Sequence, residues 1–278
     1  MGTGGVDMGN HRDGAGRRYA FGDSELAAER LGRLAGVFEP TTRAFVAAAP
    51  MPRTPRLVVD IGCGPGHTTR LLGEITAARA VVGIDQSPAF VAAARAHTPR
   101  AQMGRRVTYA VHDALSVPFP CGLGDVVFAR LVLAHLPSVA DVVASWLTQV
   151  RAGGVLLLEE VERIDTDHPV LVRYLALIGE RVRRQGSDMV AGPALAALAP
   201  TRTEVRHQLA SLRPPLGHAV TLFALNLAVL EGDPVMDDLL PERERSVLAS
   251  QLGDLAGDRR SGAIEWTMHQ TSLRPLST

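Results

Sequence analysis

The segment that most constrains this chain is the run LVVDIGCGPG at residues 57–66. Its apolar, mostly β-branched residues predict a buried strand, because such side chains suit a pleated surface covered on both faces. Its three glycines at alternate positions predict a turn where the backbone passes close to another group, since a Cβ there would collide with it. Leu71, Leu72 and Ile75 then recur at helical spacing. Strand, glycine turn and helix together predict a corner that binds a nucleotide or nucleoside.

The absence of two known motifs from this corner limits the classes of ligand that it can bind. It has no Gly-Lys-Ser/Thr ending of the kind that a phosphate-binding P-loop requires. The dinucleotide fingerprint requires a third glycine where this chain has His67. The observed pattern is Asp60-x-Gly62-x-Gly64-x-Gly66, and an acid upstream of the glycines suits a cationic ligand better than a pyrophosphate. The pattern resembles the first motif of the class I S-adenosylmethionine (SAM)-dependent methyltransferases.

Further motifs of the same family follow in order. Residues 80–85 predict a second strand that ends in Asp85, roughly twenty residues beyond the turn, and an acid at that place accepts hydrogen bonds from ribose hydroxyls. The resemblance implies that Asp85 binds both hydroxyls, that Gln86 lies against the adenine, and that Asp113 receives the adenine amino group. It spans about residues 58–160. The residues that it assigns to SAM are Tyr19, Asp60, Gly62, Cys63, Gly64, Gly66, Asp85, Gln86, His112, Asp113, Ala114 and Arg130.

Three of these assignments carry an interpretation of their own. Arg130 is expected to approach the methionine end of SAM through backbone atoms. Cys63 is expected to be a small packing residue and not a nucleophile. The ring of Tyr19 can attract a sulfonium by a cation–π interaction, worth about 0.5–2 kcal/mol. Alternatively, Tyr19 and Phe21 only pack the first helix against the core.

The order of the elements predicts an α/β fold. Strands expected at 107–114, 124–130 and 153–160 alternate with helices, which implies right-handed crossovers and a parallel sheet covered on both sides. The resemblance implies a Rossmann-like class I methyltransferase sandwich of seven strands in the order 3-2-1-4-5-7-6, with the last two strands, expected at 203–212 and 263–273, forming an antiparallel edge.

The domain prediction is a disordered arm at residues 1–17 followed by a single domain at 18–278. Within it, residues 18–50 form a helical lid of two helices, one starting at Asp23-Ser24 and one near Thr41. Residues 56–165 form the SAM-binding core. Residues 166–278 supply the acceptor-side helices and the last two strands. They include a helix at 220–230 that is apolar on nearly every face and must be buried, either as a pocket wall or in a dimer contact.

The candidate catalytic residues follow strands four and five. Methyl transfer from a sulfonium is an in-line displacement, so alignment is the main task and can be worth roughly 7–11 kcal/mol. A general base helps only where the acceptor must lose a proton. His135 and Glu160 resemble acceptor-pocket residues of related enzymes. Alternatively, His135 caps the helix that follows, and Glu159 or Glu162 is the acid that faces the pocket.

Composition excludes several function classes. The 29 basic and 29 acidic side chains balance, so the chain shows no electrostatic footprint for nucleic acid or an anionic membrane. It contains no lysine, which excludes Schiff-base chemistry and a Walker lysine. No metal site is expected, because no ligand spacing is present. The chain has no apolar stretch long enough for a membrane span and no signal peptide, so a cytoplasmic location is expected.

These observations predict that the chain transfers a methyl group from SAM to a small-molecule acceptor and releases S-adenosylhomocysteine (SAH). The acceptor atom is oxygen, nitrogen or an electron-rich ring carbon such as that of an indole. The pattern resembles the ubiquinone/menaquinone-methyltransferase-like group, which implies a role in specialised-metabolite (natural-product) biosynthesis. The alternatives are a SAM-fold protein that binds SAM without methyl transfer, such as a cyclase or a binding module, and an NAD-dependent oxidoreductase. A homodimer is left open.

Overall fold

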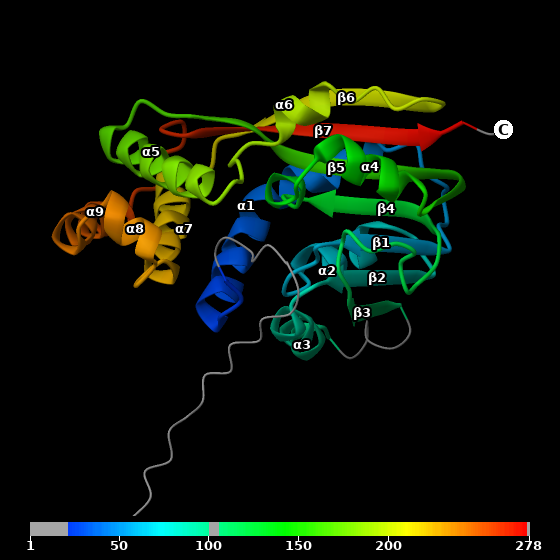
Figure 1. Cartoon of the computed structure of the whole chain (residues 1–278), viewed down its shortest axis with the longest axis horizontal. Coiled ribbons are helices and arrows are strands. Elements are labelled where there is room, and N and C mark those ends of the chain that lie inside the picture. The colour runs from blue at the N-terminus through cyan, green and yellow to red at the C-terminus, as the bar shows by residue number, and fades with distance from the viewer. Residues whose placement is uncertain (1–21, 100–105, 277–278) are drawn as a thin grey trace, which may run out of the picture.

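The computed structural model describes residues 22–99 and 106–276, and it places them in one α/β fold built around a single sheet (Figure 1). The strands are β1 (Leu57–Ile61), β2 (Ala80–Asp85), β3 (Val107–Val111), β4 (Gly124–Arg130), β5 (Val150–Asp165), β6 (Thr203–Leu212) and β7 (Glu265–Pro275). The helices are α1 (Glu25–Ala48), α2 (His67–Ile75), α3 (Pro88–His97), α4 (Val139–Leu147), α5 (Pro169–Arg184), α6 (Gly192–Ala196), α7 (Leu216–Val229), α8 (Pro234–Leu239) and α9 (Glu242–Leu255), with a 3₁₀ turn at Leu133–His135.

The sheet has the order β3-β2-β1-β4-β5-β7-β6, which confirms the predicted topology. The first five strands are parallel, and β7 runs antiparallel to both β5 and β6. In an open sheet of this kind, ligands bind outside the carboxyl ends of the parallel strands. The carboxyl ends of β1, β2, β4 and β5 therefore define where the site must lie.

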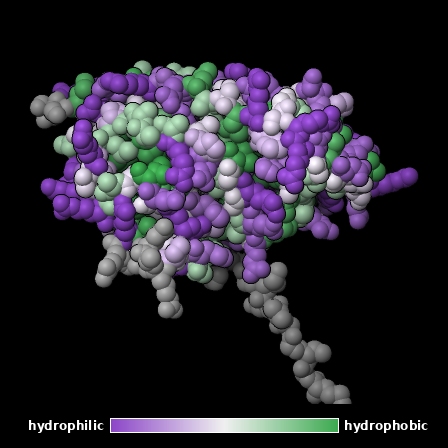
Figure 2. Space-filling view, turned by 180° about the vertical axis from the view of Figure 1, so that it is seen from behind, coloured by the Kyte–Doolittle hydropathy of each residue, from purple (hydrophilic) through white to green (hydrophobic). Residues whose placement is uncertain are grey.

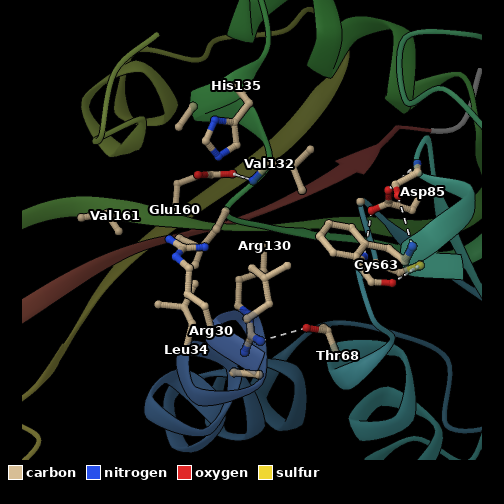
Figure 3. A pocket seen from close by; sticks show the side chains of 18 of the residues that line it. Arg30, Leu34, Cys63, Thr68, Asp85, Arg130, Val132, His135, Glu160 and Val161 are labelled. Carbon is tan, nitrogen blue, oxygen red and sulfur yellow. Dashed lines mark hydrogen bonds between the residues drawn. The ribbon is translucent and has the colours of Figure 1, made fainter. Parts of the chain in front are cut away.

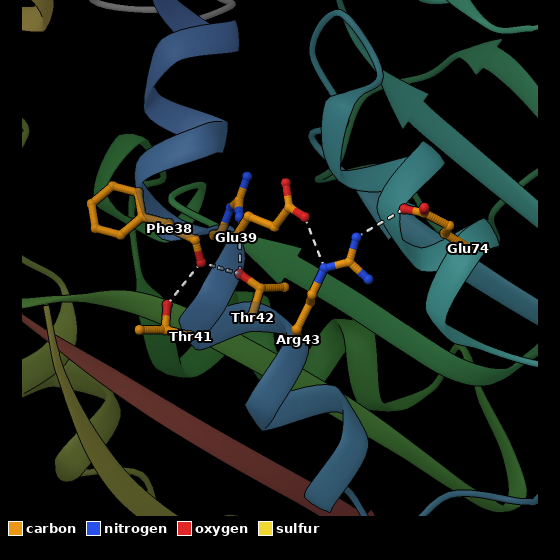
Figure 4. Close-up of polar contacts among 7 residues, drawn as sticks. Phe38, Glu39, Thr41, Thr42, Arg43 and Glu74 are labelled. Atoms are coloured by element: carbon orange, nitrogen blue, oxygen red, sulfur yellow. Dashed lines mark hydrogen bonds and ion pairs between the residues drawn. The ribbon is translucent and has the colours of Figure 1, made fainter. Parts of the chain in front are cut away.

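The first helix corrects one prediction. The sequence suggested two helices with a break before Thr41, but α1 continues without interruption through Pro40. The hydroxyls of Thr41 and Thr42 lie 2.9 and 3.1 Å from the carbonyl oxygen of Phe38, and Arg43 pairs with Glu39 at 2.8 Å across the proline (Figure 4). These contacts hold the turn around Pro40 together although the proline cannot donate a backbone hydrogen bond.

Helix α1 takes part in two cores. Phe38 packs with residues of α5, α7 and β7, whereas Phe45 and Val46 pack with β1, β4 and α2. Ser24 caps the helix as predicted, with its hydroxyl accepting a hydrogen bond from Ala27 N. The N-terminal part of α1 thus belongs to the C-terminal half of the fold, and its C-terminal part belongs to the sheet core.

The C-terminal half follows the prediction in most elements. Strands β6 and β7 and helix α7 are found close to the ranges predicted for them, and β5 extends beyond its predicted end to Asp165. The short helices α6 and α8 were not predicted. Trp146, on α4, is fully buried.

The hydropathy of the surface does not point to a further binding site. Figure 2 shows a mostly hydrophilic face in which hydrophobic residues gather only in small groups. Within the described ranges, no helix has the length and apolar character needed to cross a membrane. The predicted arm at residues 1–17, as well as Tyr19 and Phe21, lies outside the described residues.

Candidate methyl-donor and acceptor site

The glycine turn after β1 is built by two close approaches. Gly62 has φ +65°, and a Cβ there would lie 2.6 Å from Cγ2 of Val132, in the segment after β4. Gly66 has φ +81°, and its Cβ would lie 2.7 Å from the hydroxyl of Tyr109 on β3. Only glycine meets both the positive φ and the lack of space. The turn is therefore fixed by its contacts with the neighbouring strands.

Asp85 stands at the carboxyl end of β2 and faces this turn. Its Oδ2 accepts a hydrogen bond from Gly64 N at 2.8 Å, and its Oδ1 accepts one from Ser87 N at 2.9 Å. The hydroxyl of Ser87 in turn donates to Asp23, just before α1, at 2.7 Å. Burial raises the pKa of Asp85, and the two backbone N–H groups oppose that rise. The carboxylate is thereby held in one orientation beside the glycine turn.

One cavity of about 2120 Å³ connects this corner with the C-terminal helices. Sites for a single drug-sized ligand are about 300–1,000 Å³, so this cavity has room for two ligands. The predicted site residues that line it are Gly62, Cys63, Gly64, Asp85, Gln86, His112, Asp113, Ala114, Arg130, His135 and Glu160. The structure thus brings together residues from the ends of β1, β2, β3, β4 and β5.

Three predicted residues are not placed on the cavity wall. Asp60, on β1, accepts a hydrogen bond from the Thr69 hydroxyl at 2.6 Å, and burial raises its pKa to about 7. Gly66 ends the glycine turn and lies against Tyr109 instead of the cavity. Tyr19 falls outside the described residues. Cys63 is buried, and burial raises its thiol pKa, which suits the expected packing role because the thiolate is the nucleophile.

Glu160 is the acid of β5 that faces the cavity. Its Oε1 accepts hydrogen bonds from the backbone N–H groups of Val132 and Leu133, both at 2.8 Å. Its Oε2 is buried and has no hydrogen-bond partner among the described residues. Burial raises the pKa of Glu160 to about 7. Glu160 therefore has one oxygen fixed by the backbone and one buried oxygen available to a ligand.

The neighbouring acids of β5 are engaged elsewhere. Glu159 points to the opposite side and accepts hydrogen bonds from Thr42 at 2.5 Å and Gln270 at 2.6 Å. Glu162 pairs with His269 at 2.9 Å. The alternation of side chains along a strand explains why Glu159 and Glu160 face different ways. The question that the sequence left open among the three acids is resolved in favour of Glu160.

His135 ends the 3₁₀ turn after β4 and also points into the pocket (Figure 3). Burial and the charge of Arg30 lower its pKa to about 4, so the imidazole is neutral at neutral pH. It does not cap the next helix, because Ser138 holds that position and accepts from Asp141 N at 3.4 Å. The capping alternative for His135 was therefore wrong.

A polar group on the far wall was missed from the sequence. Arg30 Nε donates to Asn226 Oδ1, and Asn226 Nδ2 donates to the Tyr174 hydroxyl. The Tyr174 ring stacks on Phe223 with centroids 4.2 Å apart. All of these side chains are buried and line the cavity. The sequence signals that could have indicated this group were an arginine beside the apolar face of α1 and one asparagine within the otherwise apolar run of α7.

The functional groups on the cavity wall near the glycine turn match those needed to bind SAM. An oriented carboxylate, Asp85, is available for ribose hydroxyls, and Gly62 and Gly64 line the cavity without a side chain. In the parts of the chain that the structure describes, no group of three or more His, Cys, Asp or Glu side chains could hold a metal ion.

Comparisons with known proteins point the same way. A family model described as "Methyltransferase domain" matches residues 59–158. Trans-aconitate 2-methyltransferase of Methylobacterium radiotolerans is 32% identical over 148 residues, covering 53% of this chain and 54% of that enzyme. A tRNA U34 carboxymethyltransferase of Mannheimia succiniciproducens is 35% identical over 122 residues, covering 44% and 37%. The chain thus spans about half the length, or less, of these curated relatives.

A solved structure extends the likeness to the fold. A SAM-dependent methyltransferase from Geobacter sulfurreducens, in complex with SAH, has a TM-score of 0.51 and 21% identity and covers 85% of this chain and 90% of its own. This likeness confirms the predicted fold, and the family model assigns a methyltransferase domain to residues 59–158.

Proposed function

We propose that this chain, which carries a methyltransferase domain and has the class I SAM-dependent methyltransferase fold, transfers a methyl group from SAM to a small-molecule acceptor and releases SAH. The observation that carries the proposal is the single cavity. It holds the glycine turn and Asp85 at one end, and it holds Glu160 with an available buried oxygen on the wall beside an apolar chamber.

On the donor side, the residues of this chain would bind SAM and align its methyl group with the acceptor. Asp85 would accept hydrogen bonds from the ribose hydroxyls, and the backbone of Gly62 and Gly64 would lie against the amino-acid half of the donor. Bound SAM would supply the electrophilic methyl group. Holding two reactants in line is worth roughly 7–11 kcal/mol, which a rigid turn and an oriented carboxylate can provide.

On the acceptor side, Glu160 would remove a proton. Its Oε1 is fixed by two backbone N–H groups, so Oε2 is presented to the cavity in a defined position. A pKa of about 7 matches the working pH of a general base. His135 is neutral at that pH and can accept a hydrogen bond or proton from the same group. Both residues favour an acceptor whose nucleophilic atom carries a hydrogen.

The chamber beyond Glu160 favours an apolar acceptor that contains a ring. Its walls include the aromatic side chains of Phe38, Tyr174, Phe223 and Trp266, which contact one another in stacked and edge-on arrangements. Trans-aconitate, the acceptor named for several relatives, carries three carboxylates and would meet mostly apolar groups here. We therefore favour an indole or another ring-bearing specialised metabolite, methylated in the cytoplasm.

The experiment has two parts. Calorimetry with SAH tests the donor site, and we expect binding that Asp85→Ala weakens. Incubation with methyl-labelled SAM, trans-aconitate and a panel of indoles, phenols and amines tests transfer. Label in a small molecule supports the proposal. SAH binding without labelled product from any acceptor or cell extract would instead favour a SAM-binding protein without transferase activity, and binding of NADH without SAH would favour an oxidoreductase.

A further inference from the structure

Arg130, the last residue of β4, directs a cationic side chain toward the glycine-turn end of the cavity. Its Nη1 donates to the Thr42 hydroxyl on α1 at 2.9 Å. Its Nη2 donates to the Thr68 hydroxyl on α2, also at 2.9 Å (Figure 3). Both partners are neutral. A guanidinium carries five N–H donors in a fixed planar fork, so these two bonds leave part of its donor capacity unused.

The acids near Arg130 are engaged with other groups. Glu159 is satisfied by Thr41, Thr42 and Gln270, and Asp60 accepts from Thr69. Both acids attract the guanidinium, but neither forms an ion pair with it, and none of the other described acids does. Burial lowers the pKa of Arg130, and the charges of Glu159, Asp60 and Glu39 oppose that fall. A cation in such a place is costly unless an anion approaches it.

The position of Arg130 relative to Asp85 limits which anion that is. Asp85 marks the sugar end of the donor site and bonds to Gly64. Figure 3 shows Arg130 away from Asp85, with Cys63 of the glycine turn between them in this view. The donor must cross the turn from its ribose toward its methionine portion. That portion ends in a carboxylate, and planar bidentate pairing with a carboxylate is what a guanidinium does best.

We propose that the Arg130 side chain binds the α-carboxylate of the methyl donor and so positions its sulfonium. This inference rests on the proposed function and replaces the expectation that Arg130 contributes only backbone atoms. An acceptor carboxylate is the other source of the same chemistry. We favour the donor because Arg130 contacts Thr68 at the start of α2, which adjoins the glycine turn, whereas the acceptor chamber is lined by α5, α7 and β7 together with α1.

The test compares two ligands that differ only in the amino-acid portion. SAH carries the carboxylate, and 5′-methylthioadenosine keeps the adenosine and sulfur but lacks the amino-acid arm. Calorimetry of the full chain should show that Arg130→Gln weakens SAH binding about 10- to 100-fold, the range expected for a lost charge-assisted hydrogen-bonded pair. The affinity for 5′-methylthioadenosine should change little. Arg130→Lys keeps the charge but not the fork, and it should fall between wild type and Arg130→Gln.

Arg43→Gln is the matched control. Arg43 lies on α1 next to Thr42 but pairs with Glu39 and Glu74 and does not line the cavity, so its loss should leave both affinities unchanged. An Arg130→Gln variant that weakens both ligands equally would show a structural role only and overturn the inference. Unchanged SAH binding would also overturn it and would redirect Arg130 to an acceptor carboxylate. A wild-type chain that binds neither ligand would instead contradict the proposed function.

Discussion

At the scale of single residues, backbone N–H groups set the chemistry of the two carboxylates that matter most. Asp85 receives one such bond on each oxygen, so both oxygens are oriented and the carboxylate can only accept. Glu160 receives both bonds on a single oxygen, which leaves the other one buried and available. The first arrangement suits holding a ligand, and the second suits exchanging a proton.

Replacement of Glu160 by Gln should reduce turnover while leaving donor affinity unchanged. The amide keeps an oxygen for Val132 N and Leu133 N but cannot take a proton, and general-base catalysis contributes about 10²- to 10⁴-fold. Wild-type rates should rise with pH through about 7, because the base is active only when ionised. The rate that remains in Glu160→Gln should lack that rise. Glu162→Gln, which alters an acid paired with His269, should keep the wild-type profile.

The same group predicts a pH dependence of stability. The folded pKa of Glu160 is about 7 against an ordinary value of 4.5, so between these values the folded state binds more protons than the unfolded state. The free energy of unfolding that Glu160 contributes must then fall as pH rises across that window. Glu160→Gln should therefore gain stability relative to wild type between pH 5 and 8, by at most about 3 kcal/mol. Denaturant titrations at both pH values measure this, and a gap that stays constant would contradict it.

At the scale of elements, the turns of this fold require glycine for two separable reasons. Gly66 has a positive φ and also meets Tyr109 and Ala94, whereas Gly122 has a similar φ of +82° with nothing within 4 Å of its Cβ position. The first position is limited by conformation and space, and the second by conformation alone.

A pair of alanine substitutions separates the conformational penalty of a positive φ from the steric penalty of a close contact. Gly122→Ala should cost about 1–2 kcal/mol, the penalty of the left-handed region for a residue with a Cβ. Gly66→Ala should cost more by roughly 1–3 kcal/mol, because the new methyl group overlaps a packed ring. Urea unfolding monitored by circular dichroism measures both variants. Equal losses would mean that Tyr109 moves aside without penalty.

The sequence predicts well the elements that are determined by residues close together in the chain, and it predicts poorly those that depend on contacts between distant segments. The strands of the core follow from β-branched runs, and the glycine turn follows from residues 57–66 alone. The continuity of α1 could not be predicted, because it depends on hydroxyl contacts around Pro40 and on packing against distant helices. The pairing of Arg30, Asn226 and Tyr174 joins α1, α7 and α5, which no local pattern reports. Glu160 was a candidate, but its orientation required the register of β5.

At the scale of the whole molecule, the donor end of the cavity is built by the sheet and the acceptor end by the later helices, while α1 borders both. Leu31, Leu34 and Phe38 line the cavity, and Phe45 and Val46 are core residues. Ligand binding should therefore stabilise the N-terminal part of α1 and leave the outer helix α9 unchanged.

Hydrogen exchange measures that expectation. SAH should slow amide exchange in residues 25–39 of α1 and around residues 62–66, because bound ligand suppresses local opening of the elements that cover it. Exchange in α9, which contributes no residue to the cavity wall, should stay the same. Slowing restricted to the glycine turn would show that α1 does not respond to the donor.

The position of α1 along both ends of one cavity has a consequence for the kinetics of ligand binding. If the chain transfers methyl groups as proposed, two ligands that share this chamber beside α1 should bind in a compulsory order, with the donor before the acceptor. The demethylated thioether would then leave last and would inhibit turnover as it accumulates. Cellular supply of the donor relative to that by-product would, in consequence, govern flux through this step.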